Sequence, residues 1–168
     1  MRKVVGAMVL VSGLLLASGC TTATPNVAFI VGGEAVSNSE VEDLVVACAQ
    51  AFKQEPREVS SQVLSFVLEG RIAAHILTDK GIKYSNAERE EFLRQSTLGN
   101  TLLRNPTCQQ VGYGVADYAL LIDQLSMEDF IAAQQQVEVV LNPRYGYWDP
   151  TAATVIGNGS LSETANGS

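Results

Sequence analysis

The segment EVSSQVLSFVLEGRIAAHILTD, residues 58–79, decides the fold class of this chain. Apolar residues recur along it at helical spacing and then spread to several sides of the helix. The main set is Val59, Val63, Phe66, Val67, Ala74 and Leu77, and Leu64, Leu68, Ile72 and Ile76 widen it. Such a helix is normally contacted by others, so we expect it at the centre of a helical domain. Glycine costs about 1 kcal/mol relative to alanine inside a helix, so Gly70 indicates close packing against a neighbouring helix.

Capping signals on both sides predict further helices. Ser37 followed by Glu40 is a capping box, and the apolar stripe after it predicts a helix that ends near Pro56. Ser85 with Glu88, and Ser126 before a short apolar run, predict two more helix starts. From about Thr107 one helical face is traced by Val111, Val115, Tyr118, Ala119, Ile122 and Leu125. With a short turn at Leu98–Arg104, the chain is expected to be mainly α, with four to six helices.

Two β-branched runs flank the helices. Val27–Val31, ended by two glycines, and Val137–Leu141 both favour short strands. We expect them to pair and to close residues 27–150 into a single domain. The tail, residues 151–168, is rich in Gly, Ser, Thr and Asn and is expected to be disordered.

The N-terminus carries an export signal. Arg2 and Lys3 precede an apolar stretch, and small residues lead to Cys20. This predicts a signal peptide over residues 1–19 rather than a membrane span. The segment resembles the lipobox of bacterial lipoproteins, which implies lipidation of Cys20, a tether over residues 20–26 and anchoring to the outer face of a bacterial membrane. An ordinary signal peptide with an incidental cysteine is the other interpretation.

The net charge of the chain argues against two classes of partner, and its cysteines indicate a disulfide. Loss of residues 1–19 removes two cations, so the formal net charge of −7 becomes −9. This acidity argues against nucleic-acid binding and against further attraction to anionic headgroups. Besides Cys20 the chain has Cys48 and Cys108, which an oxidising compartment favours as a disulfide. Two buried thiols are the alternative.

Signals for catalysis are missing from the sequence. His75 is the only histidine and sits in the apolar helix, where a structural role is expected. There is no nucleotide-binding glycine loop, no nucleophile elbow and no zinc spacing of Cys and His. The acidic run at residues 88–91 is interpreted as a solvated helix face. We therefore expect a protein that is not an enzyme and that uses neither metal nor cofactor.

Four stretches resemble the N-terminal chaperone domain of exported folding factors of the SurA and PrsA type. They are Val27–Ser37, Val63–Leu77, Gly81–Glu88 and Leu141–Asp149, the last being the most specific. Fuller members of that family insert a parvulin prolyl isomerase before the closing strand. Here Gln136 passes directly to Val137, and one histidine cannot supply the paired histidines of a parvulin site.

The resemblance implies an ATP-independent holdase that binds unfolded or translocating polypeptides. Such a protein needs an adaptable apolar surface, for which Phe66 and Ile72 are candidates, although both also suit a filled core. Tyr145, Tyr147 and Trp148 form either a binding platform or a strand packed over the helices. The alternative functions are a module that holds one specific envelope partner, a binder of a small ligand near these aromatics, and an isomerase relative that has lost its catalytic domain.

Overall fold

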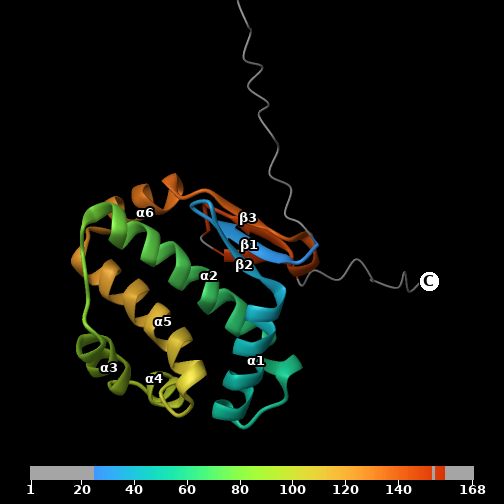
Figure 1. Cartoon of the computed structure of the whole chain (residues 1–168). Helices are drawn as coiled ribbons and strands as arrows, with labels where there is room; N and C mark the ends of the chain where they lie inside the picture. Colours follow the sequence, from blue (N-terminus) through green and yellow to red (C-terminus); the bar gives the residue numbers. More distant parts are fainter. Residues whose placement is uncertain (1–24, 153, 158–168) are drawn as a thin grey trace, which may run out of the picture.

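The computed structural model describes residues 25–152 and 154–157 (Figure 1). The expected signal peptide, Cys20 and the end of the tail from residue 158 lie outside the described residues. Within them the chain is mainly helical, with six α-helices and five short strands. The predicted fold class is thus confirmed at the level of a mainly helical domain with a small antiparallel sheet. No helix among the described residues has the length and apolarity needed to cross a membrane.

Helix α2 (Pro56–Lys80) is central, as its sequence predicts. It contacts α1 (Asn38–Phe52), α5 (Pro106–Gln124) and α6 (Met127–Gln136), as well as the sheet. Gly70 lies where α2 crosses α5, and a Cβ built there would stand 2.7 Å from the Cα of Gly114. The two backbones therefore touch, and the close packing predicted at Gly70 is confirmed.

Helix α5 is buried along a different line from the predicted one. Its buried residues are Cys108, Val111, Gly112, Ala116, Asp117 and Leu121. Of the predicted face only Val111 is fully buried, while Tyr118, Ile122 and Leu125 are half-buried. Small residues face α2 because the helices are so close, and the larger ones pack at the sides, where Tyr118 meets Phe130 of α6 edge to face.

The capping signals mark the helix starts correctly. Ser37 accepts a hydrogen bond from the backbone N–H of Glu40 (3.1 Å), but the Glu40 carboxylate turns to Arg71 of α2 (2.6 Å) rather than back to Ser37. Ser85 and Glu88 form the full capping box of α3 (Asn86–Arg94). Ser126 begins α6, and Ser96 begins the short α4 (Thr97–Leu102).

Strands from the two ends of the domain pair, as predicted. β1 (Val27–Val31) lies between β2 (Glu34–Ser37) and β3 (Val139–Leu141), and both pairings are antiparallel, with Phe29 opposite Leu141. β2 was not expected. Gly32 and Gly33 both have positive φ, which allows the chain to turn straight back after β1.

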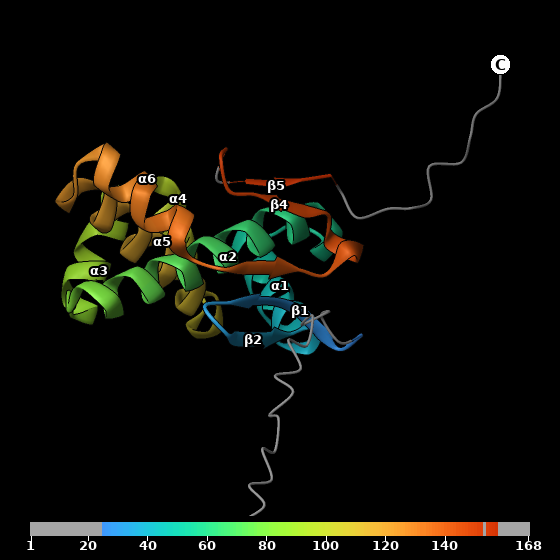
Figure 2. The same cartoon turned by 90° about the horizontal axis from the view of Figure 1, so that it is seen from above.

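A second hairpin lies beside β3 (Figure 2). β4 (Tyr147–Asp149) pairs with β5 (Thr154–Ile156), with Trp148 opposite Val155. The expectation of a disordered tail from residue 151 is therefore wrong for Thr154–Ile156. The tail's overall composition obscures this run of three β-branched residues, which favours a strand.

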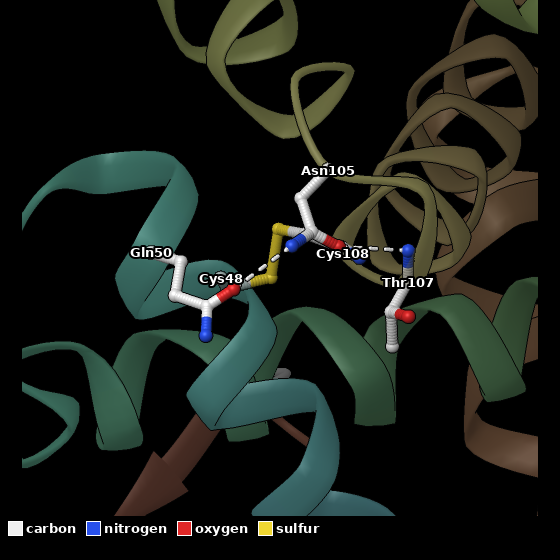
Figure 3. The surroundings of a disulfide bond; sticks show 5 residues. All are labelled: Cys48, Gln50, Asn105, Thr107 and Cys108. Carbon is white, nitrogen blue, oxygen red and sulfur yellow. Dashed lines mark hydrogen bonds between the residues drawn. A yellow bond between two sulfur atoms is a disulfide. The ribbon is translucent and has the colours of Figure 1, made fainter.

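Cys48 of α1 and Cys108 of α5 form a disulfide (Figure 3). Both residues are fully buried. Beside them Asn105 caps α5 by accepting from the N–H groups of Thr107 (2.9 Å) and Cys108 (3.2 Å), and its amide donates to Gln50 of α1 (3.3 Å). The bridged interpretation is confirmed, and it fixes α1 to α5.

Candidate functional site

A groove with a volume of about 490 Å³ lies between α1, the first half of α2 and the C-terminal hairpin. Its apolar residues are Val41, Val45, Val46, Leu64 and Val155, and its polar residues are Glu42, Ser60, Ser61, Ser65, Arg144 and Tyr145. Val46 is 47% exposed, which is unusual for a β-branched aliphatic residue inside a helix. The groove thus combines an apolar floor with a polar rim.

Local sequence explains two walls of the groove. On α1, Val41 and Val45 are one turn apart and buried, while Val46 continues the apolar surface outward into the groove. On α2, Pro56 begins the helix and three serines follow on the side that faces the groove. Serine side chains are short, so they leave room above the floor and supply hydroxyl groups at its edge.

Tyr145 forms the third wall and is held in place. It ends the 3₁₀ turn Pro143–Tyr145, and its hydroxyl donates to Oδ1 of Asn38 (3.0 Å). The Arg144 guanidinium carbon lies 5.1 Å from the centre of the Tyr145 ring. A phenol is protonated at neutral pH and can donate, and burial raises the pKa of Tyr145 further.

Gly146 allows the hairpin to fold back over this wall. Its φ is +116°, and a Cβ there would lie 2.5 Å from the carbonyl oxygen of Ile156. A larger residue would therefore push β5 away from Tyr145. The placement of Val155 and Gly157 at the groove depends on this one position.

The structure separates the three aromatic residues for which the sequence left two interpretations, a binding platform or a strand packed over the helices. Only Tyr145 lines the groove. Tyr147 and Trp148 are neighbours on β4, so their side chains point to opposite faces of the strand. Trp148 packs against the core, and Tyr147 is 59% exposed. The residues therefore do not form one surface.

The two candidates on α2 also differ from each other. Ile72 has no exposed surface, so its assignment to an exposed binding surface is wrong, and the core interpretation holds. Phe66 is half-buried and lines a second cavity of about 300 Å³ between α1, α2, α3 and α5.

That second cavity is bordered by ion pairs already complete within the fold. Asp117 of α5 is buried, and Arg89 of α3 donates to both its oxygens, Nε to Oδ1 at 2.7 Å and Nη2 to Oδ2 at 3.0 Å. On the other side Arg71 pairs with Glu40. These contacts fasten helices together and leave none of the four charges uncompensated.

Helix α3 does more than present a solvated face. Beyond the Arg89–Asp117 pair, Glu90 accepts a hydrogen bond from the hydroxyl of Tyr113 (2.9 Å) and pairs with Arg94. The Tyr113 hydrogen bond lowers the pKa of Glu90. The interpretation of residues 88–91 as merely solvated therefore misses two links to α5.

The contacts of His75 suit a structural role. Its Nε2 lies 3.5 Å from Oδ2 of Asp79, and its ring packs against Gly32 in the turn between β1 and β2. A side chain at Gly32 would occupy the space of the imidazole. Within residues 25–152 and 154–157, no three His, Cys, Asp or Glu residues gather in a way that could hold a metal ion.

One further ionisable group lies between helices. Burial raises the pKa of Glu69 on α2 from 4.5 to about 7. Burial, followed by the charge of Glu69, raises the pKa of Tyr118 on α5. Nearby Gln134 of α6 is buried, and its Nε2 has no hydrogen-bond partner among the described residues. The junction of α2, α5 and α6 is therefore polar but incompletely paired.

Sequence reasoning missed most of the groove. Val46, the serines of α2 and Val155 were not singled out. Two signals point to the residues on the helices: Val46 stands just outside the apolar stripe of its helix, and three serines lie within residues 60–65. Comparison with protein-family models, with curated proteins and with solved structures finds no match for this chain.

Proposed function

We infer that this protein is an ATP-independent holdase that binds unfolded or translocating polypeptides outside a bacterial membrane. The observation that carries the proposal is the open groove with its apolar floor and polar rim. Exposed apolar surface rimmed by polar groups is typical of protein interaction sites. The resemblance to SurA- and PrsA-type chaperone domains supports the same function.

The location rests on two features. The lipobox-like sequence before Cys20 supports export and lipid anchoring. The disulfide between Cys48 and Cys108 supports an oxidising compartment, since such bonds rarely persist in the cytosol. Together they favour an envelope protein held at a membrane surface.

A charge placed in the groove tests the binding function. Val46→Asp adds a carboxylate among the apolar residues that line the groove, at a position exposed enough to accept it without unfolding the core. Ile131→Asp is the matched control, because Ile131 is 44% exposed on α6 and does not line the groove. We expect the unaltered protein and the control to suppress aggregation of a heat-unfolded client, and Val46→Asp to lose most of that activity.

Two results would contradict this proposal, the first its function and the second only its assignment to the groove. One is no suppression at a stoichiometric amount of the unaltered protein. The other is equal suppression by the two variants, with thermal unfolding showing that both remain folded. The second result would leave a holdase that does not use this groove.

A module for one specific envelope partner is the second candidate. It is favoured by the rigidity of the groove wall, since Tyr145 is fixed by Asn38 and a preformed wall suits a single ligand. Capture on the intact protein from an envelope extract separates the two functions. One stoichiometric partner lost in Val46→Asp favours the module, and a broad set of polypeptides favours the holdase.

A further inference from the structure

We propose that the groove wall formed by Tyr145 faces the membrane, so that the protein binds polypeptides directly at the bilayer surface. The inference rests on the proposed function and on lipidation of Cys20. It assigns an orientation to the anchored protein and a membrane-proximal position to its clients.

The chain enters the fold beside the groove. The Asn38 side chain donates from Nδ2 to the carbonyl oxygen of Pro25 (2.8 Å), and its backbone N–H donates to the carbonyl oxygen of Asn26 (2.9 Å). The same side chain accepts from the Tyr145 hydroxyl through Oδ1 (3.0 Å). One asparagine therefore joins the point where the tether begins to the wall of the groove.

The tether is short compared with the domain. From Cys20 to Pro25 the chain spans five residues, which reach at most about 17 Å when fully extended. A compact domain of about 130 residues has a radius of gyration of about 14 Å and is therefore more than 30 Å across. A tether shorter than the domain's diameter restricts which side of the domain can approach the lipid. The side that carries Asn38 and Tyr145 is the one held close.

Charge argues that lipid does not fill the groove. After loss of residues 1–19 the formal net charge is −9, and Glu42 lines the groove. Anionic headgroups repel such a domain, so the groove is held near the surface without being pressed onto it. This leaves space at the interface for another chain.

The hairpin beside the groove suits an extended polypeptide. β5 pairs only with β4 among the described strands, so one edge of β5 has no strand partner there. Val155 and Gly157, at this strand and just after it, line the groove. Because Val155 of β5 lines the groove, an extended segment bound there would pair with the free backbone groups of this strand and place its apolar side chains against the groove's valines. We assign the groove to extended, apolar segments of exported polypeptides.

The orientation of the anchored protein is measured by the quenching of a fluorescent label by lipids that carry nitroxide headgroups. The label is placed at Ser61, which is exposed and lines the groove, or at Glu91, which is exposed on α3 at the end of the molecule away from the sheets (Figure 1). The full lipidated protein is inserted in vesicles of phosphatidylethanolamine and phosphatidylglycerol. We expect quenching at Ser61 at least about twofold stronger than at Glu91. Equal or reversed quenching overturns the orientation.

Lengthening the tether provides the second variant. Fifteen Gly and Ser residues inserted between Thr22 and Ala23 add a flexible span of about 20 Å or more, so the difference between the two labels is expected to shrink toward equality. A difference that persists undiminished overturns the tether as its cause.

Aggregation suppression by the same lipidated protein in detergent micelles separates the two proposals. If suppression is seen while the two labels quench equally, the orientation fails and the holdase function stands. If there is no suppression in micelles, the proposed function fails, and with it the assignment of the groove to polypeptides, whatever the quenching shows.

Discussion

Reduction of the Cys48–Cys108 disulfide should cost this domain about 4 kcal/mol of stability. The two cysteines are 60 residues apart, and in the chain-entropy model a closed loop of that length restricts the unfolded chain by about 4 kcal/mol at 25 °C. Both residues are fully buried where α1 meets α5, so reduction leaves two thiols inside a packed contact and removes no side chain. The folded structure should persist with a smaller free energy of unfolding.

Urea titration with and without reductant measures this difference. Trp148, the only tryptophan, is half-buried against the core and reports by fluorescence, while circular dichroism reports on the helices. We expect the midpoint to fall on reduction and the slope with urea to rise, because the reduced unfolded chain is more expanded. Agreement between the two probes supports a two-state treatment.

The double variant Cys48→Ala/Cys108→Ala is the control and must not respond to reductant. It should be somewhat less stable than the reduced protein, because two buried sulfur atoms are lost as well. A difference below about 1 kcal/mol between oxidised and reduced protein would refute the reasoning. It would mean that the unfolded chain already keeps α1 and α5 close, or that the bond strains the fold.

Two further changes act at the helix junctions. Because burial raises the pKa of Glu69 from 4.5 to about 7, the folded state holds this proton more tightly than the unfolded state, and the free energy of unfolding should fall as pH rises from about 4.5 to 7. The full pKa shift corresponds to about 3 kcal/mol, and solvent access reduces this free energy to about 1–2 kcal/mol. Glu69→Gln should therefore stabilise the protein by about 1–2 kcal/mol at pH 8 in urea titrations and should have no such effect at pH 4. A gain that is the same at both pH values would contradict this cause. Gly70→Leu should destabilise the domain by about 3 kcal/mol or more, because even the Cβ of the new side chain would lie 2.7 Å from the Cα of Gly114. A melting temperature within about 2 °C of that of the unaltered protein would show that α2 and α5 can separate freely.

Local signals account for what sequence could predict. Ser85 with Glu88, and Ser126, place helix starts because the contacts that cap a helix lie within three residues. The length and apolarity of α2 made its central position predictable, and Gly70 indicated a close crossing although not its partner, Gly114.

The remaining features depend on residues far apart in the chain. Arg89 and Asp117 form a partly buried ion pair across 28 positions, and no local pattern links them. The groove joins α1, α2 and β5, so it exists only after the hairpin folds back at Gly146. The burial of Ile72 could not be predicted from its own helix either. An apolar residue off the main stripe suits the surface and the core equally well until the positions of the neighbouring helices are known.

The position of β1 in the middle of its sheet determines how the domain bears a mechanical load. In the proposed anchored protein the lipidated N-terminus precedes this strand in the chain, and β1 is bonded to β2 on one side and β3 on the other. Tension on the N-terminus pulls along β1, so the interstrand hydrogen bonds on both sides of this strand are loaded together in shear rather than broken one at a time. If the proposed anchoring holds, a load on the N-terminus would therefore act first on the hydrogen bonds of β1 and only then on the helices.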